Sequence, residues 1–220
     1  MNILVIDVGG THIKVRSTTH PGKIEINSGP EMTPRKMVAA VTAATKGWPI
    51  DVITIGYPGA VLHGRIASEP HNLGQGWVGY NFKRAFRRPL KIINDAAMQA
   101  LGSYEGRHML FLGLGTGLGS ALIVDGVLEP MELAHLPYRK GRTYEEYVGL
   151  AGLKRLGKKK WRRRVAEVVR LLQKALEADY VVLGGGNARL LKRLPPGARL
   201  GNNAHAFRGG CRLWTNHGKP

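Results

Sequence analysis

Three glycine-rich turns, each directly after an apolar run of strand length, are the residues best suited to bind an anion. They contain Gly9-Gly10, Gly115-Thr116-Gly117 and Gly184-Gly185-Gly186. Neighbouring glycines adopt backbone angles that other residues avoid, so successive N–H groups can line a concave anion site. Three such turns predict one elongated anionic ligand held between two related halves. A Walker loop is absent, because no Gly-Lys-Ser/Thr triplet follows any of them.

The first turn also carries polar groups that suit phosphate chemistry. Thr11 adds a hydroxyl, Lys14 a cation, and Asp7 a carboxylate that can hold a hydrated Mg²⁺ ion. The alternative is a tight β-hairpin that binds nothing, since a second apolar run follows at residues 13–15. The same strand–turn–strand pattern recurs at residues 110–124, and this internal echo favours the anion site.

An amide and a carboxylate, Asn94 and Asp95, follow a predicted strand at residues 90–93 and precede a predicted helix from Ala96 to about Tyr104. This is the usual position of ligand groups in open α/β sheets. The alternative is helix capping, for which Asn and Asp are preferred. Capping explains one of the two more easily than both, so Asp95 is a candidate catalytic residue.

Other polar candidates are more ambiguous. Glu132 and His135 have a spacing that can direct both to one ligand, although a lone His is more often structural. Glu145 and its neighbour Glu146 lie in a basic segment, where carboxylates can be ordinary charge partners. The segment 63–77 lacks periodicity and is predicted to be a loop in which Asn72 and Trp77 line a polar pocket.

The elements that must position these groups alternate between strands and helices. Helices are predicted at 33–47, with Thr33 as N-cap and Pro34 in the first turn, from Lys158 onward, and at 188–194. A dinucleotide-binding fold is a poor match, because strand-like residues follow Gly10 and Gly119 where that fold has a helix. We expect an N-terminal lobe at 1–93 and a C-terminal lobe at 94–220, with the last residues frayed.

Composition excludes several classes of protein. The chain has 220 residues, 43% of them hydrophobic, enough for one large core or two small lobes. No apolar run approaches the roughly 20 residues that span a bilayer, and no signal peptide is visible, so we expect a cytoplasmic protein. The single cysteine, Cys211, excludes an intramolecular disulfide and a cysteine-based zinc site.

The net charge of +18 is concentrated in one segment. Between Arg139 and Arg164 there are 11 basic residues against two acidic ones. Such a segment attracts polyanions such as nucleic acid, polyphosphate or anionic lipid. The alternative is a solvated basic face without a partner.

Five ordered motifs resemble those of the ROK family (repressor, open reading frame, kinase) of sugar kinases, most closely its polyphosphate glucokinase branch. They are Asp7-Val8-Gly9-Gly10-Thr11 with Lys14, Asn94-Asp95-Ala96, Leu114-Gly115-Thr116-Gly117-Leu118-Gly119, Glu132-Leu133-Ala134-His135 and Leu183-Gly184-Gly185-Gly186. The resemblance implies an α/β fold of the two-lobed actin/hexokinase-like (ribonuclease H-like) type with a central cleft. It also implies transfer of a phosphoryl group to the 6-hydroxyl of glucose or a related hexose, in a possible homodimer.

The resemblance assigns a role to each motif. Asp95 would accept the proton of the sugar hydroxyl, and Asn94, Glu132, His135 and Glu145 (or Glu146, one register step away) would bind the sugar. The first turn with Asp7, Gly9, Gly10, Thr11 and Lys14, and the second with Gly115, Thr116 and Gly117, would hold phosphates. Gly185 and Gly186 would lie near the adenosine of a nucleotide donor.

This chain differs from many ROK proteins, which carry a histidine and a cysteine cluster that binds structural zinc. Its single cysteine leaves no cysteine cluster for structural zinc, so we expect Mg²⁺ but no zinc. The basic segment and the polyphosphate glucokinase likeness favour polyphosphate as donor, with or instead of ATP. The alternative is a non-catalytic sugar- or nucleic-acid-binding ROK-type protein, which would not need an acid at position 95; we consider nucleic-acid binding the less favoured.

Overall fold

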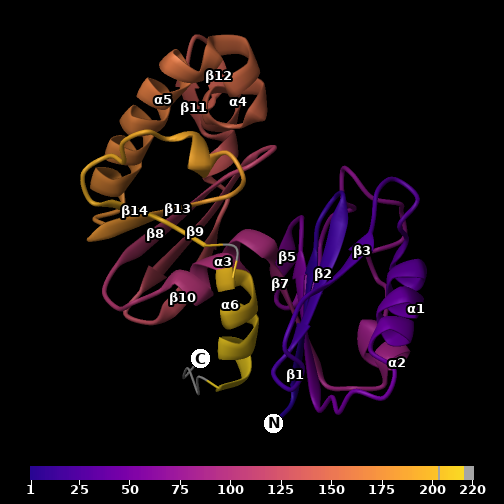
Figure 1. The fold of residues 1–220 in the computed structure, drawn as a ribbon. Helices are drawn as coiled ribbons and strands as arrows, with labels where there is room; N and C mark the ends of the chain where they lie inside the picture. The colour runs from indigo at the N-terminus through magenta and orange to yellow at the C-terminus, as the bar shows by residue number, and fades with distance from the viewer. Residues whose placement is uncertain (203, 216–220) are drawn as a thin grey trace. The chain divides into compact units, whose positions relative to one another are not determined.

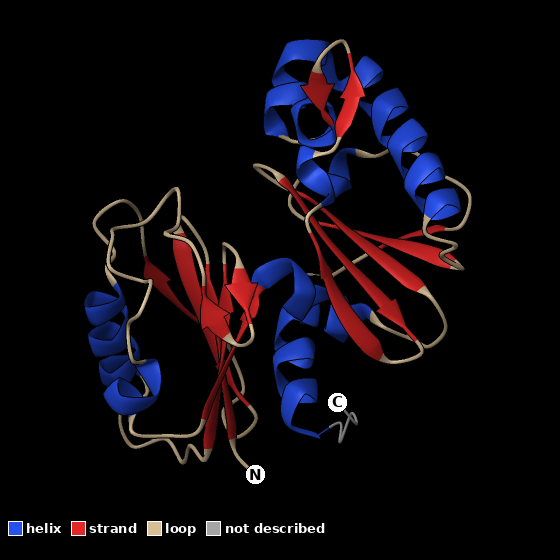
Figure 2. Cartoon of the chain, turned by 180° about the vertical axis from the view of Figure 1, so that it is seen from behind, coloured by secondary structure: helices blue, strands red, loops and turns tan. Residues whose placement is uncertain are grey.

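The computed structural model describes residues 1–202 and 204–215 and divides them into two compact units. The first unit contains residues 1–98 and 206–215, and the second contains residues 99–202 with 204 and 205. Each unit is built on one five-stranded sheet with helices against it (Figure 2).

The sheet of the first unit has the strand order β3-β2-β1-β4-β7. Its strands are β1 (Ile3–Val8), β2 (His12–Ser17), β3 (Ile24–Asn27), β4 (Val52–Tyr57) and β7 (Leu90–Asn94). The first three strands form an antiparallel meander, whereas β4 and β7 run parallel to β1. The carboxyl ends of β1, β4 and β7 therefore lie at one edge of the sheet.

The sheet of the second unit repeats this topology, with the order β10-β9-β8-β13-β14. Its strands are β8 (Met109–Leu114), β9 (Leu118–Val124), β10 (Val127–Met131), β13 (Tyr180–Gly184) and β14 (Ala198–Leu200). Again three strands form an antiparallel meander and two run parallel to its first strand. The echo in the sequence is thus a repeat of the fold: the β1–β2 and β8–β9 turns occupy equivalent positions.

The alternation of side chains along β1 places helices on both faces of the first sheet. Leu4 and Ile6 pack into a core with Met37 of α1 (Pro34–Ala44) and Phe82 of α2 (Phe82–Phe86). On the other face, α6 (Ala204–Thr215) approaches β1 so closely that a Cβ at Gly210 would lie 2.6 Å from Val5 Cγ1. Figure 1 shows the sheet between these helices.

In the second unit, α5 (Leu150–Ala175) supplies most of the helical core, with Trp161, Val165 and Val168 packed among Leu110 and Leu112 of β8. This helix is broken at one residue, Gly157, whose φ of 72° and ψ of 157° are not helical. The smaller elements are β5 (Val61–Leu62), β6 (Arg65–Ile66), α3 (Asp95–Ser103), η1 (Leu133–His135), β11 (Pro137–Arg139), β12 (Arg142–Thr143), α4 (Tyr144–Val148) and η2 (Ala188–Leu190).

Most expected elements are present, and four features differ. Helix α5 begins at Leu150 rather than at 158, and η2 is a single 3₁₀ turn instead of a helix over 188–194. The loop expected at 63–77 contains β6, which pairs with β5. Trp77 is fully buried in the first core and lines no polar pocket. The residues expected to fray, 216–220, lie outside the described residues.

The division into units differs from the expected split into 1–93 and 94–220. Asp95 directly follows β7, an edge strand of the first sheet, and therefore belongs to the first unit. Helix α6 also belongs to the first unit, because Thr54 Oγ1 donates a hydrogen bond to Gly210 O (2.8 Å) and accepts one from Trp214 Nε1 (2.8 Å). No helix among the described residues is long and apolar enough to cross a membrane.

Candidate active site

The first glycine turn, between β1 and β2, is closed by backbone contacts that leave no room for a side chain. Gly9 N–H donates to His12 O (3.1 Å), and a Cβ at Gly9 would lie 2.7 Å from that oxygen. Ser28 Oγ donates to Gly9 O (2.6 Å). Ser28 thus fixes the turn from the end of β3, a role without a local sequence signal because 19 residues separate the partners.

Asn72 lies against this turn, as its proposed site role requires. A Cβ at Gly10 would lie 3.1 Å from Asn72 Cβ, so Gly10 permits close contact. Glu69 shapes the loop that carries Asn72, because its carboxylate accepts hydrogen bonds from Gly76 N, Trp77 N and Val78 N at 2.9–3.1 Å. Sequence reasoning missed Glu69, which a carboxylate within a Gly-rich loop could have signalled.

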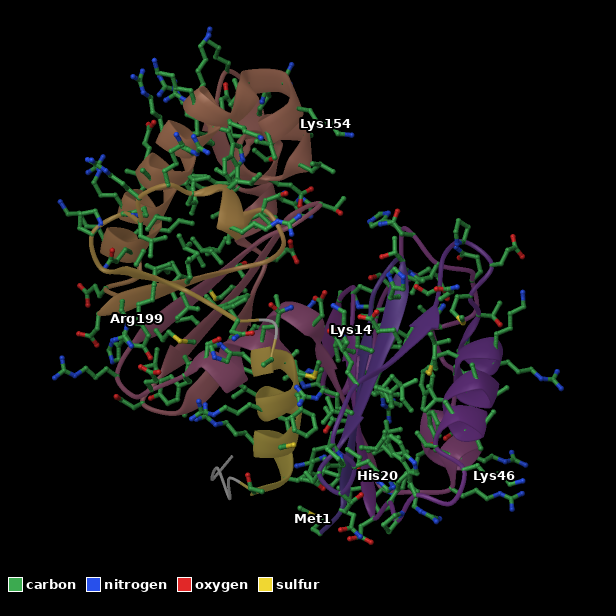
Figure 3. All side chains as sticks on the ribbon, in the orientation of Figure 1. Met1, Lys14, His20, Lys46, Lys154 and Arg199 are labelled. Atoms are coloured by element: carbon green, nitrogen blue, oxygen red, sulfur yellow. The ribbon has the colours of Figure 1, made fainter. Side chains whose placement is uncertain are left out.

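Asp7 lies on β1 opposite Lys14 on β2 (Lys14 is labelled in Figure 3). Burial raises the pKa of the Asp7 carboxyl, while the positive charge of Lys14 acts in the opposite direction. Because desolvation is the larger effect, the proton is held more tightly than in water.

Asp95 is the first residue of α3, at the carboxyl edge of the first sheet. Its Oδ1 accepts a hydrogen bond from Ala96 N (2.7 Å). Burial, together with the negative charge of Asp7, raises the pKa of Asp95 to about 7, against the lowering effect of backbone hydrogen bonds. A carboxyl with this pKa is poised to accept a proton near neutral pH.

Asn94 has a structural role beside it. Its Oδ1 accepts from Ala97 N (3.1 Å), as in helix capping, and its Nδ2 donates to Gly59 O (3.0 Å). One amide hydrogen remains for a substrate. Capping therefore explains Asn94, whereas Asp95 carries the perturbed pKa.

Asp7 and Asp95 together suit a magnesium ion. Mg²⁺ prefers oxygen ligands and is commonly held by one or two carboxylates with substrate phosphates. The negative charge of Asp7 raises the pKa of Asp95, and a cation near both carboxylates would remove this repulsion. Among the described residues, no group of three or more His, Cys, Asp or Glu side chains could hold a metal.

The second glycine turn, between β8 and β9, is held by a carboxylate. Glu145 Oε2 accepts a hydrogen bond from Leu118 N (2.9 Å), and a Cβ at Gly117 would overlap that oxygen. Leu150 N donates to Thr116 O (3.1 Å), which ties the turn to the start of α5. The Glu145 carboxylate therefore lies against this turn and binds the backbone N–H of Leu118, the residue that follows it.

The geometry separates Glu145 from Glu146. Glu146 belongs to the capping box of α4: its Oε2 accepts from Thr143 N (2.8 Å), and Thr143 Oγ1 accepts from Glu146 N. Its carboxylate is committed to the helix end. The Glu145 carboxylate instead contacts the second turn through Oε2, which makes Glu145 the better candidate for a ligand contact.

The third glycine turn packs directly on the second. Asn187 Nδ2 donates to Gly115 O (2.9 Å), and Asn187 N donates to Leu114 O (2.9 Å). Gly185 has φ +79°, and a Cβ there would lie 2.5 Å from Leu114 O. The second and third turns therefore form one backbone surface. Asn187 belongs to it; the sequence analysis did not single out this residue, although its place directly after the three glycines could have signalled it.

Glu132 and His135 lie together at the ends of η1, with Oε1 and Nε2 3.6 Å apart and both side chains exposed. Ala134 between them is buried. The element η1 packs beside α4, which carries Glu145. In the second unit, the predicted sugar ligands Glu132, His135 and Glu145 thus lie on or at the ends of two neighbouring elements. In the first unit, Asp7 is close enough to raise the pKa of Asp95, and Asn72 lies against the first glycine turn.

No protein-family model matches the chain. The polyphosphate glucokinase of Mycobacterium tuberculosis is 29% identical over an alignment that covers 87% of this chain and 80% of the relative. Among solved structures, the inorganic polyphosphate/ATP-glucomannokinase of Arthrobacter sp. strain KM superposes with a TM-score of 0.80 at 23% identity, covering 96% of this chain and 97% of that one.

A ROK family glucokinase of Streptomyces griseus, solved with glucose and AMPPNP, has a TM-score of 0.72 at 15% identity, with coverage of 97% and 99%. These likenesses confirm the predicted fold class and the predicted resemblance to ROK-family sugar kinases near the polyphosphate glucokinases. The chain is therefore a relative of the polyphosphate glucokinases and has the fold of the ROK-family sugar kinases.

Proposed function

We propose that this chain is a hexose kinase that transfers a phosphoryl group from polyphosphate, ATP or both to the 6-hydroxyl of glucose or a related sugar. The observation that carries the proposal is Asp95, a carboxyl with a pKa raised to about 7 at the carboxyl edge of the first sheet. A non-catalytic sugar- or nucleic-acid-binding protein has no need of such a group. Relatives named as glucokinases support the enzyme.

Phosphoryl transfer needs positioning and charge neutralisation more than covalent help from the protein. Asp95 accepts the proton of the attacking sugar hydroxyl. Asp7 would hold Mg²⁺, which would neutralise charge on the donor phosphates. The first turn, with Gly9, Gly10, Thr11 and Lys14, and the second turn, with Gly115, Thr116 and Gly117, bind phosphate groups. Gly185 and Gly186 accompany a nucleotide donor.

The sugar hydroxyls are bound by Asn94 through its remaining amide hydrogen and by Glu132, His135 and Glu145 of the second unit. Asn72 contributes from beside the first turn. Loss of turnover after substitution of each of these residues tests its assignment. We further propose a location in the cytoplasm, a homodimer, and no role for zinc or nucleic acid.

The test is a coupled assay for hexose phosphate with glucose and mannose, each with ATP and with polyphosphate, in Mg²⁺ buffer. We expect turnover with at least one pair and its loss in Asp95→Asn. The matched control is Asp125→Asn, since Asp125 is an exposed turn residue of the second unit. Failure with every hexose and both donors would leave the non-catalytic alternative.

A further inference from the structure

Helix α5 presents a row of cations to solvent that its packing does not require. Lys159, Arg163, Arg170 and Lys174 are exposed and lie opposite Trp161, Val165, Val168 and Leu172, which face the core. At 3.6 residues per turn, these four cations share one side of the helix. We call them the outer stripe. Figure 3 shows nitrogen-tipped side chains around this end of the second unit, among them the labelled Lys154.

Other cations of the basic segment between Arg139 and Arg164 have partners within the fold. Arg155 donates to Glu146 O and stacks on Tyr147. Arg162 Nε donates to Leu190 O (2.6 Å). Arg164 and Arg139 both pair with Glu167, at 2.6 and 3.3 Å. The fold thus accounts for these four.

The outer stripe has no such partners. None of its four side chains makes an ion pair or hydrogen bond with another described residue. The acids nearest in sequence are Glu167, which Arg139 and Arg164 already hold, and Glu177 beyond the end of the helix. The stripe therefore carries uncompensated positive charge.

This arrangement is unfavourable for the folded chain alone. Like charges four residues apart, as in Lys159 with Arg163 and Arg170 with Lys174, destabilise a helix by a few tenths of a kcal/mol each. Lys158 and Lys160 add positive charge just after the break at Gly157, where the helix dipole disfavours cations. A bound polyanion would offset both costs.

The four cations span about 22 Å along the helix axis, since each residue rises about 1.5 Å. A linear polyanion matches such a row, whereas a single phosphate meets only one or two charges. The exposed positions of α5 carry no aromatic side chain on which bases could stack, and this disfavours single-stranded nucleic acid as the ligand. A hollow lined by Arg170 itself, by the paired Glu167 and by Gln173, Pro195 and Pro196 adjoins the row.

We infer that the outer stripe is an accessory docking surface for long-chain inorganic polyphosphate, separate from the glycine turns. The inference rests on the proposed function for its biological meaning, because a chain held here could remain bound while its end is consumed. Its physical content, binding of a linear polyphosphate to α5, is independent of turnover.

The test compares two quadruple variants of the full chain. One replaces the outer stripe by Lys159→Gln, Arg163→Gln, Arg170→Gln and Lys174→Gln. The control removes the same charge from exposed cations of the first unit, by Arg35→Gln, Lys46→Gln, Lys83→Gln and Arg84→Gln. Binding of long-chain polyphosphate is measured directly over a range of salt concentrations. KM is measured for long-chain polyphosphate, for tripolyphosphate and for ATP.

We expect the stripe variant to bind long-chain polyphosphate on the order of 10-fold to 100-fold more weakly at low salt. The slope of log affinity against log salt should fall by about 3, as expected for four lost phosphate contacts. The KM values for ATP and tripolyphosphate should stay within about twofold, and the control should bind like wild type. Equal weakening in both variants would reduce the effect to net charge and overturn the inference.

Two further outcomes decide between the docking surface, a general polyanion surface and the proposed function. If the wild-type chain binds an oligonucleotide as tightly as polyphosphate of equal charge, and loses both in the stripe variant, the surface is a general polyanion surface and the inference is wrong. If no sugar is phosphorylated with any donor but stripe-dependent polyphosphate binding persists, the proposed function fails while the docking surface stands.

Discussion

Replacement of Asp95 by Asn tests the central chemical claim, because it removes the base with little change in shape. At a pKa of about 7, about a tenth of the wild-type Asp95 carboxyl is ionised at pH 6 and about nine-tenths at pH 8. The kcat/KM of the wild type should therefore rise about 10-fold between these pH values, since this parameter reports the free enzyme. In the Asn variant, kcat should fall on the order of 10²–10⁴-fold.

The same substitution has a predicted effect on stability with a definite sign. The folded-state pKa of Asp95 is raised above its ordinary value of 3.8, so the folded chain binds the proton more tightly. Its contribution to stability is present at low pH and is lost as the pH rises through 7. Three pKa units correspond to about 4 kcal/mol, and partial exposure of Asp95 reduces this to about 1–3 kcal/mol.

Urea denaturation at several pH values measures this effect. Asp95→Asn should be more stable than the wild type at pH 8, and the difference should shrink toward pH 5. Turnover should be followed under the same conditions with saturating sugar and donor. A variant that retains more than a tenth of wild-type kcat, or a wild type whose kcat/KM is flat from pH 6 to pH 8, would refute Asp95 as the base.

Three other substitutions test the glycine turns. Gly117→Ala places a methyl group on the Glu145 carboxylate and should displace it. Although position 117 is in the phosphate turn, the KM for the sugar should therefore rise at least about 10-fold. An unchanged KM for the sugar would contradict a sugar-binding role for Glu145. Gly185→Ala introduces a Cβ at a position with φ +79°, within 2.5 Å of Leu114 O. It should lower the free energy of unfolding, measured by urea titration, by about 1–3 kcal/mol. An unchanged free energy of unfolding would contradict the tight packing of the second and third turns. Ser28→Ala removes the hydrogen bond to Gly9 O of the first turn and should lower the free energy of unfolding by about 0.5–1.5 kcal/mol. It should also raise the KM for the phosphoryl donor. An unchanged KM for the donor would show that the first turn does not need this hydrogen bond.

Local patterns were sufficient for the strands and turns because they depend on nearby residues. The apolar runs of β1 and β8 and the glycines that follow them specify strand, turn and strand without long-range information, and the apolar runs of β4 and β13 specify strands in the same way. Helix α1 was equally visible, since Thr33 caps it as its sequence predicts. By contrast, the start of α5 was placed too late in the chain, because Gly157 breaks the periodicity in the first third of the helix.

Candidate site residues divide along the same line. The glycine turns, Asp95 and the Glu132–His135 pair are visible as motifs. Ser28 and Asn187 donate hydrogen bonds to backbone carbonyls of distant segments, and no spacing in the sequence marks Ser28. Glu69 instead accepts hydrogen bonds within its own loop, where a carboxylate among glycines is a visible signal. The choice between Glu145 and Glu146 as the ligand residue also required the tertiary structure, since the two are adjacent in the same charged segment and only their hydrogen-bond partners distinguish them.

By itself, the sequence determined the repeated strand–turn–strand pattern, the ROK-family resemblance and the excess of positive charge, all of which follow from residue type and order. Only the tertiary structure decided that Asp95 belongs to the first unit, that α6 returns to that unit, and that Glu145 occupies the second turn. The physical reason is that a raised pKa, a carboxylate seated on a turn and a helix packed on a distant strand arise from burial and contacts between segments far apart in the chain.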